Sequence, residues 1–492
     1  MGKDRNIMKR YFMLVLGVII PIMTTFIYYF LNLRFGDSVF DLPISSWGDG
    51  ILYYKQIESL VNGGNLQGYY GFNESHAEIG KMAAWSPIIY VPFTLLGMIA
   101  GWNYSSPIIY NVIYWIIAFE LFVILLKPRL VQFTSFSIMW ISFGILHYYS
   151  LQCMAESFIA SLTVIYVIIA FKYSYDSRQF NIWLVIALVL LVLLTLMRGY
   201  CAVFGLPLFY FALKKVGKLV SAIIGIVMIL STATYIVIIK KYTSLYFWPL
   251  IDASWVRAFR YGIRPGIEST LERFLLAYSE CKELILGTLA RNYMWYASYV
   301  LLIIAMLWLL YKTFRDRKLS YVSVLIIPLA FIAAFWMLYD VGNGGRQFIC
   351  LVCGFFLILA MDQKASPLIG VVLLLSFYMT WFTKGDVKFL NTSSNASFET
   401  EVSRLTDYLN AEQGISEWDN TIVWAYGTQT LYGVPSKFGL NCCRDEYLEE
   451  NGGSLKAKYV MIGKGSPAEK YVQPSGWKYL DTFLDMDLYS TR

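Results

Sequence analysis

The stretch Trp47-Gly48-Asp49-Gly50-Ile51-Leu52-Tyr53-Tyr54 follows the first long apolar run of the chain, Tyr11 to Leu33. A run of this length can cross a bilayer, so we predict that Asp49 lies just outside a membrane. A carboxylate there is costly to desolvate, the glycines let backbone approach a ligand closely, and the tyrosine rings can line a groove. Asp49 is therefore a candidate functional residue. The alternative is that it caps a helix that begins near Ile51.

The composition predicts a membrane protein. The chain has 492 residues, of which 58% are hydrophobic and 15% are charged, a balance that is rare in soluble proteins of this size. Many apolar runs reach transmembrane length, which indicates a polytopic α-helical protein. The net charge of +7 does not indicate nucleic-acid binding, because most basic residues lie in short loops, where they report orientation. The first run is too long for a cleaved signal peptide and lacks a small-residue cleavage site.

The cysteines and histidines predict no metal site. Cys350 and Cys353 have the spacing of a redox or zinc motif, but they lie in an apolar run, where buried free thiols are expected. His76 and His147 are too few and too far apart in the sequence to favour a metal.

Positive charge predicts the topology. Lys3, Arg5, Lys9 and Arg10 precede the first run, so the N-terminus is predicted to be cytoplasmic. If later basic clusters are cytoplasmic too, the proline-containing run Trp85 to Gly101 cannot be a span, and we predict that it lies at the outer interface. The remaining predicted spans are about Ile108–Leu126, Val131–Ser150, Ser157–Phe171, two short helices over Asn181–Leu213, Leu219–Ile239, Tyr293–Tyr311, Tyr321–Leu338, Phe348–Met361 and Ile369–Phe382. The total is about eleven transmembrane helices, with the N-terminus inside and the C-terminus outside.

Two domains are expected on this basis. Residues 1–383 form the transmembrane domain, with a first outer loop over 34–107 and a second large outer loop over 240–291. The helix from Ile51 to Val61 is predicted to lie on the outer surface, since its apolar residues recur at helical spacing. Residues 384–492 form a small soluble extracytoplasmic α/β domain. Its predicted elements are a helix over Phe398–Leu409 and strands over Thr421–Tyr426, Lys458–Ile462 and Trp477–Leu488.

Carboxylates and arginines gather at the predicted outer side. Glu156 lies on a short outer turn, Arg198 at the turn between the two short helices, and Arg346 after two glycines. Since neither short helix spans a bilayer comfortably, Arg198 is predicted to lie inside the protein. An arginine fork suits phosphate oxygens, and a carboxylate can remove a proton from an acceptor hydroxyl. The alternatives are that Glu156 and Arg198 are structural ion-pair partners and that Arg346 is an anchor at the outer interface.

The pattern resembles the GT-C superfamily of polytopic glycosyltransferases, which includes protein mannosyltransferases and the aminoarabinose transferase of lipid A. Asp49 and Tyr53 match the Asp-x-x-x-Tyr spacing of its first outer loop, and Glu156 matches the acidic residue of the next one. Trp85-Ser86-Pro87 is similar to its proline-containing helix, and Gly344-Gly345-Arg346 to its late outer turn. The likeness covers about residues 10–383, mainly as topology. The mannosyltransferases have Asp-Glu at the first motif, whereas Gly50 follows Asp49 here, which leaves metal use and the acceptor open.

The resemblance implies a GT-C-like, inverting glycosyltransferase in the cytoplasmic (inner) membrane of a bacterium. It implies a polyprenyl-phosphate-linked sugar as donor, such as one on undecaprenyl phosphate, and a surface polysaccharide or lipopolysaccharide (O-antigen) as acceptor. The implied catalytic residues are Asp49 as the base and Glu156 as an acceptor- or base-orienting group. The implied substrate-binding residues are Tyr53, Tyr54, Trp85, Arg198 and Arg346. No metal and no redox cofactor are implied.

Two other functions are compatible with a polytopic chain. An O-antigen or capsule polymerase would use a pyrophosphate-linked donor, but the early Asp49 motif and the soluble tail argue against it. A lipid-linked sugar flippase or transporter would show inverted repeats with broken helices at the midplane, and the sequence contains no such repeat.

Overall fold

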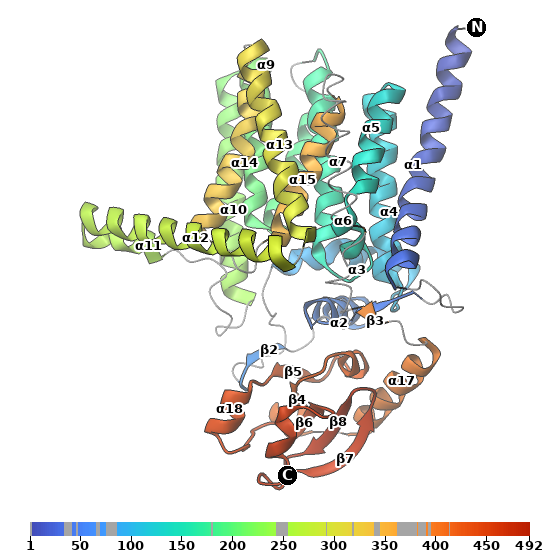
Figure 1. The fold of residues 1–492 in the computed structure, drawn as a ribbon, viewed down its shortest axis with the longest axis vertical. Helices are drawn as coiled ribbons and strands as arrows, with labels where there is room; N and C mark the ends of the chain where they lie inside the picture. Colours follow the sequence, from blue (N-terminus) through green and yellow to red (C-terminus); the bar gives the residue numbers. More distant parts are fainter. Residues whose placement is uncertain are drawn as a thin grey trace.

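The computed structural model contains a helical bundle and a small C-terminal domain that lies at one end of it (Figure 1). The residues that it describes are 2–33, 42–45, 48–64, 69–74, 86–178, 181–242, 254–291, 293–316, 319–338, 345–361, 381, 390–391, 395–412 and 414–492. Trp47, Trp85 and Gly344 lie outside the described residues, as does the predicted span Ile369–Phe382 except for Trp381.

Helices of very different length build the part of the chain before the C-terminal domain. Its first half contains α1 (Gly2–Leu33), α2 (Gly48–Gly63), η1 (Pro87–Tyr90), α3 (Val91–Ala100), α4 (Ser106–Leu121), α5 (Leu130–Ser142), α6 (Gly144–Ser150), α7 (Ala155–Tyr175) and α8 (Ile182–Met197). Its second half contains η3 (Gly199–Phe204), α9 (Gly205–Lys215), α10 (Lys218–Tyr242), α11 (Ser254–Ala258), η4 (Phe259–Tyr261), α12 (Ile263–Arg291), α13 (Tyr293–Asp316), α14 (Leu319–Leu338), η6 (Gly345–Gln347) and α15 (Phe348–Met361).

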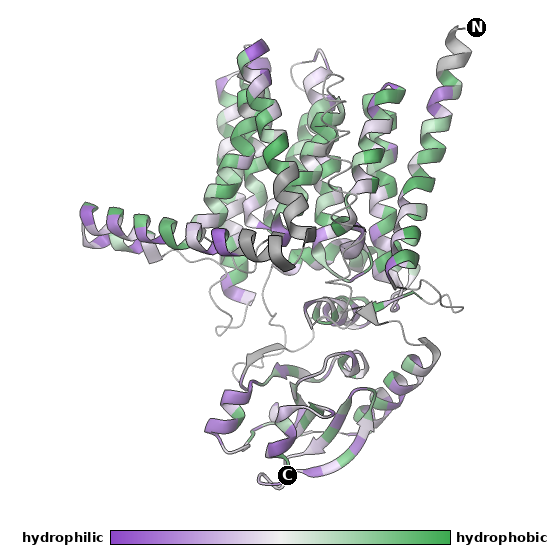
Figure 2. Cartoon of the chain, viewed as in Figure 1, coloured by the Kyte–Doolittle hydropathy of each residue, from purple (hydrophilic) through white to green (hydrophobic). Residues whose placement is uncertain are grey.

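The chain is a multi-pass membrane protein. Within the described residues, four helical segments are long and apolar enough to cross a bilayer: Ile7–Asn32, Ser106–Leu126, Ala155–Tyr175 and Lys218–Tyr242. They confirm four of the predicted spans. Hydrophobic residues run along the bundle helices, whereas the elements of the C-terminal domain contain both hydrophilic and hydrophobic residues (Figure 2). The total of about eleven spans and the orientation in the membrane stay predictions.

One predicted span is not a straight helix. Val131–Ser150 is divided into α5 and α6, which are bent by 69° against each other. Phe143 causes the break, because its backbone (φ −90°, ψ 73°) leaves the helical region between the two helices. The apolar pattern continues through the bend, so the sequence pattern alone gave no sign of it.

The two short helices that were predicted around Arg198 are present as α8 and α9. The run after Trp85 is also short, as predicted, and consists of η1 and α3. Ser86 begins it by accepting a hydrogen bond from the Ile88 amide, and Pro87 occupies the first helical position.

The second outer loop is largely helical where the structure describes it. α12 lies across the end of the bundle, roughly perpendicular to the spanning helices, and extends beyond them (Figure 1). Five large side chains at helical spacing on α12 are exposed: Ile263, Ile267, Leu271, Phe274 and Tyr278. An exposed apolar stripe on a helix that lies across the end of a transmembrane bundle is typical of a helix at the membrane interface.

The C-terminal domain is an α/β unit, as predicted. It contains α17 (Asn395–Ala411), η10 (Gln429–Gly433), α18 (Asp445–Glu450), β4 (Thr421–Ala425), β5 (Gly439–Cys442), β6 (Tyr459–Gly463), β7 (Lys478–Phe483) and β8 (Met486–Ser490). α17, β4 and β6 agree with the predicted helix and the first two predicted strands. The predicted strand Trp477–Leu488 is wrong, because a turn at Leu484 (φ 49°) divides it into the antiparallel pair β7 and β8.

The sheet of this domain also takes a strand from the first outer loop. Its order is β2-β5-β4-β6-β8-β7, in which β2 (Tyr69–Phe72) pairs in parallel with β5. The loop is fixed there by Glu74, whose buried carboxylate accepts hydrogen bonds from the Lys456 and Ala457 amides and from the Tyr447 hydroxyl. The sheet is therefore not built from residues 384–492 alone, and the first outer loop and the domain form one structure.

Candidate active site

α2 positions Asp49 at the junction between the bundle and the C-terminal domain. Asp49 lies in the first turn of α2, and 43% of its side-chain surface is exposed. α2 is enclosed between the bundle and the C-terminal domain (Figure 1), and its residues from Gly50 to Ile57 are buried. Its place at the outer surface of the membrane stays a prediction. Both the bundle and the domain cover the helix: Val61 lies against Gly97 of α3, whereas Tyr54 and Lys55 contact Tyr432 of the domain.

Four charged side chains from four separate segments meet at this junction. The Arg346 Nη2 lies 2.9 Å from the Asp49 Oδ2, and its Nε lies 3.5 Å from the Glu156 Oε1. The same Glu156 oxygen lies 3.4 Å from the Arg198 Nη2. The predicted site residues Asp49, Glu156, Arg198 and Arg346 are thus brought together as a chain of ion pairs, which we call the charged cluster.

Burial divides the charged cluster into an inner and an outer half. The Arg198 and Glu156 side chains are 1% and 3% exposed, whereas those of Arg346 and Asp49 are 13% and 43% exposed. Two carboxylates balance two guanidinium groups, which is the condition under which charges can be buried. The inner pair therefore forms the base of the site, and a ligand can reach the outer pair.

Each member has a local reason for its position. Glu156 lies in the first turn of α7, where the helix dipole favours a carboxylate. Arg198 ends α8, and Gly199 follows it because the Tyr235 ring packs there: a Cβ on Gly199 would come within 2.5 Å of that ring. Arg346 lies in η6, directly before α15. The prediction that Arg198 lies inside the protein is confirmed, since it is fully buried.

Tyr53 lies one helical turn after Asp49 on α2 and is nearly buried. Burial raises the pKa of its hydroxyl well above the ordinary value, although the nearby Arg198 lowers it. Tyr53 is therefore a neutral phenol beside the charged cluster, able to donate a hydrogen bond.

Sequence reasoning missed the pair that links the two arginine turns. The Tyr200 hydroxyl donates to the Gln347 Oε1. Tyr200 lies two positions after Arg198, and Gln347 lies one position after Arg346. Their closeness in the sequence to the two predicted arginines could have marked them as candidate site residues. The hydrogen bond joins η3 to η6 and fixes the Arg198 and Arg346 turns relative to each other.

Tyr54 does not join the charged cluster. Its ring lies 5.2 Å from Trp102, 5.6 Å from Tyr104 and 4.9 Å from Tyr432, between ring centroids. Tyr54 therefore points away from the side of α2 that carries Asp49 and Tyr53, since consecutive helical residues point about 100° apart, and its role in substrate binding stays a prediction. Trp85, the other predicted aromatic contact, lies outside the described residues.

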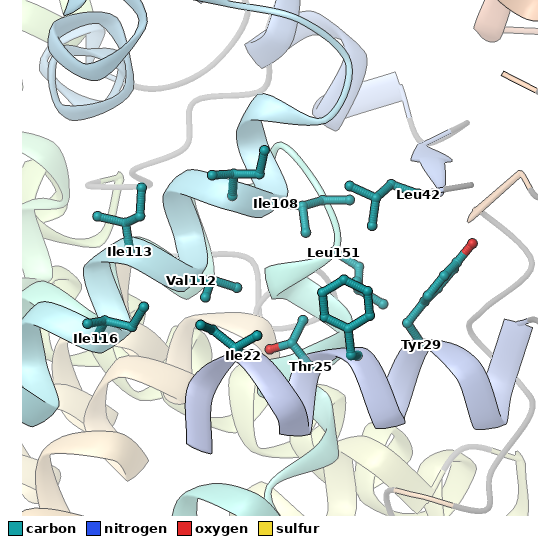
Figure 3. Close-up of a pocket in the computed structure, with 11 residues that line it drawn as sticks. Ile22, Thr25, Tyr29, Leu42, Ile108, Val112, Ile113, Ile116 and Leu151 are labelled. Atoms are coloured by element: carbon teal, nitrogen blue, oxygen red, sulfur yellow. The ribbon is translucent and has the colours of Figure 1, made fainter. Parts of the chain in front are cut away.

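An apolar cavity of about 360 Å³ lies between α1 and α4 (Figure 3). Its walls are mainly aliphatic, with Ile22 from α1 and Ile108, Val112 and Ile116 from α4. Leu42 and Leu151 also line it, from segments that lead to α2 and α7. Its size is within the range of ligand pockets, about 300–1,000 Å³, and its lining suits a hydrocarbon chain.

Comparison with known proteins gives similarity in structure only. Neither a protein-family profile nor a curated protein sequence matches the chain. AglB, the oligosaccharyltransferase of Archaeoglobus fulgidus, solved with an inhibitory peptide and a dolichol-phosphate, is similar with a TM-score of 0.53 and 12% identity, over 93% of this chain and 70% of that one. ArnT from Cupriavidus metallidurans, solved with undecaprenyl phosphate, is similar with a TM-score of 0.53 and 8% identity, over 96% of this chain and 98% of that one. At such identities the likeness concerns the fold.

Proposed function

We propose that this chain, which has the GT-C fold, is an inverting membrane glycosyltransferase that uses a polyprenyl-phosphate-linked sugar. The observation that carries the proposal is the charged cluster: a half-exposed carboxylate, Asp49, paired with Arg346 above a buried Glu156–Arg198 pair. AglB and ArnT, which share the fold, were solved with a dolichol-phosphate and with undecaprenyl phosphate. Both ligands are isoprenoid lipids with a single phosphate.

Arg346 is the proposed phosphate ligand. Of the two arginines, it has the more exposed side chain, while Arg198 is enclosed beneath it. Its planar fork matches phosphate oxygens, and its Nη2 donates a hydrogen bond to the Asp49 Oδ2 at 2.9 Å. A phosphate in the site competes for this fork, and its arrival releases Asp49 from the ion pair.

Asp49 is the proposed general base. It takes the proton of the acceptor hydroxyl while the hydroxyl oxygen attacks the anomeric carbon. The bond from that carbon to the phosphate oxygen breaks, and the electron pair leaves with polyprenyl phosphate, whose charge Arg346 stabilises. Because the nucleophile attacks from the side opposite the phosphate, the anomeric configuration inverts.

The other residues position these groups. Glu156 is too deeply buried to meet an acceptor, and it holds Arg198 and Arg346 at 3.4 Å and 3.5 Å. Arg198 therefore supports Glu156 rather than binding the phosphate itself. Tyr53 is the proposed hydrogen-bond donor to the sugar or the phosphate.

The α1–α4 cavity supports a substrate with a lipid chain. Both helices contain spanning segments, so the cavity lies at membrane depth, and aliphatic side chains form most of its wall. We propose that it receives part of the hydrocarbon chain of a lipid-linked substrate.

The proposed setting is the inner membrane of a bacterium, with the charged cluster and the C-terminal domain on the periplasmic side. The proposed acceptor is a surface polysaccharide or lipopolysaccharide. The basic residues before the first span support this orientation, because such residues favour the cytoplasmic side.

Sugar transfer with purified protein in proteoliposomes tests the proposal. One reaction contains a polyprenyl-phosphate sugar and a lipopolysaccharide acceptor, and a second contains the corresponding polyprenyl-pyrophosphate sugar. We expect a new glycosidic bond and release of polyprenyl phosphate in the first reaction only. Transfer from the pyrophosphate donor alone would favour a polymerase, and movement of the lipid across the bilayer without transfer would favour a flippase.

A further inference from the structure

Lys55 is a buried cation further along α2 from Asp49, and only 2% of its surface is exposed. Its ammonium group pairs with Glu58 on the same helix. It also donates a hydrogen bond of 3.0 Å to the carbonyl of Tyr432, which is 377 residues away in the chain. A buried ammonium group is costly unless such partners hold it. Lys55 therefore ties α2 to η10 of the C-terminal domain.

Tyr432 contacts α2 and the segment before it. Its ring packs edge-on against Tyr54, with 4.9 Å between the centroids. Its hydroxyl donates to the carbonyl of Ser45, at 3.2 Å, on the short strand β1 (Ile44–Ser45) that precedes α2. Ser45 in turn lies against the first turn of α2, since a Cβ on Gly50 would be 3.2 Å from its Oγ. One residue of the domain thus holds both the entry and the middle of the helix.

A further contact brings the domain to the neighbour of Asp49. A Cβ built on Gly48 would lie 3.9 Å from the Thr428 Cγ2, just before η10. Lys55 lies about 9 Å beyond Asp49 along the helix axis at 1.5 Å per residue. It therefore acts on Asp49 only by fixing the helix that carries it.

We propose that the C-terminal domain is part of the catalytic unit and sets the position of Asp49, with Lys55 and Tyr432 as positioning residues. The inference rests on the proposed function, in which Asp49 is the base. A displacement of about 1 Å at a reacting group can lower a rate about 10²-fold. Loss of either contact therefore lowers kcat, while donor binding through Arg346, which lies on η6, is kept.

The test compares Tyr432→Phe, which removes only the hydroxyl, with Lys55→Met, which removes the ammonium group and keeps an unbranched side chain. For both we expect kcat to fall about 10- to 100-fold with an unchanged KM for the donor. Lys55→Arg should recover much of the rate. Lys478→Met, at an exposed position on β7, is the matched control and should behave like the wild type.

A positioning role makes a prediction that a purely structural role does not. In an Asp49→Asn background, Tyr432→Phe and Lys55→Met should cost no further activity, because the group that they position is already lost. Two results would overturn the inference. One is an equal fold-decrease in kcat with Asp49 present and with Asp49→Asn, and the other is an unchanged kcat when Asp49 is present. If Lys55→Met does not fold, Tyr432→Phe decides.

Hydrogen exchange separates this inference from the proposed function, because it needs no activity. In Tyr432→Phe we expect faster amide exchange over α2 and unchanged exchange in β4 and β6. Unchanged exchange over α2 would contradict the inference even if sugar transfer is found. Absence of transfer by the wild type, together with faster exchange over α2, would reject the function and keep the mechanical link.

Discussion

Replacement of Arg346 by alanine should impair donor use far more than folding. The fork of Arg346 contacts Asp49 at 2.9 Å and Glu156 at 3.5 Å. After its removal, Glu156 keeps Arg198 at 3.4 Å, and Asp49 is exposed enough to be hydrated. No carboxylate is left without a cation or water, so we expect a cost in stability below the about 3–5 kcal/mol that breaking a fully buried pair entails.

The loss in activity follows from the phosphate. A hydrogen bond to a charged group contributes about 1.5–3 kcal/mol, which corresponds to about 10- to 150-fold in the rate at low donor concentration. Arg346→Lys should recover part of this loss, because an ammonium group keeps the charge but lacks the planar fork. The assay is the initial rate of sugar transfer from a polyprenyl-phosphate donor in proteoliposomes, measured over a range of donor concentrations.

The matched control is Arg404→Ala. Arg404 also pairs with two carboxylates, Glu401 and Asp481, but it does so on the C-terminal domain, away from the charged cluster. The Arg404→Ala variant should leave the rate of sugar transfer unchanged. Wild-type transfer by Arg346→Ala at a normal yield of folded protein would refute the phosphate role and leave Arg346 as a structural residue.

Three other predictions concern orientation, the buried pair and the cavity. A reporter that is active only in the periplasm, fused after Arg492, should be active; activity of a cytoplasmic reporter alone would show that the predicted topology is wrong. Glu156→Gln should lower the free energy of unfolding by about 3–5 kcal/mol, measured by denaturation in detergent, because it leaves the buried Arg198 without its carboxylate. The exposed control Glu449→Gln on α18 should not change this free energy, and equal stability of Glu156→Gln and the wild type would mean that the pair is dispensable. Val112→Trp should fill the α1–α4 cavity and raise the KM for the lipid-linked donor several-fold. Ile229→Trp, on an exposed face of α10, should leave this KM unchanged. An unchanged KM in Val112→Trp would mean that the donor does not use the cavity.

The meeting of the charged residues could be predicted from the sequence for a physical reason. Glu156, Arg198 and Arg346 each end or interrupt an apolar helix, and alternating passes through a membrane bring such ends to one side. Charges that are buried there must pair, so a carboxylate and an arginine at the same level are expected to meet. The order of the pairs, with Glu156 between the two arginines, depends on side-chain reach and could not be predicted.

The role of the C-terminal domain could not be predicted, because its contacts join distant parts of the chain. Periodicity indicates that α2 has a buried face, but it does not say what covers the opposite one. The pairing of β2 with β5 and the contact of Lys55 with Tyr432 link residues more than 360 positions apart. The four residues Tyr69–Phe72 are too short a run to indicate a strand on their own. The packing of Tyr54 could not be predicted for the same reason, since its partners Tyr104 and Tyr432 come from other segments.

Sugar transfer by Asp49→Asn tests the central claim most directly. Asparagine keeps the shape of aspartate and caps a helix about as well, but it cannot accept the proton. The account predicts a loss of about 10²–10⁴-fold in the transfer rate, with folding and donor binding retained. Asp419→Asn is the control, since Asp419 forms a similar pair with Arg492, at 2.8 Å, on the C-terminal domain, and should be silent. Near-normal turnover by Asp49→Asn would contradict the catalytic role and reduce Asp49 to a helix cap.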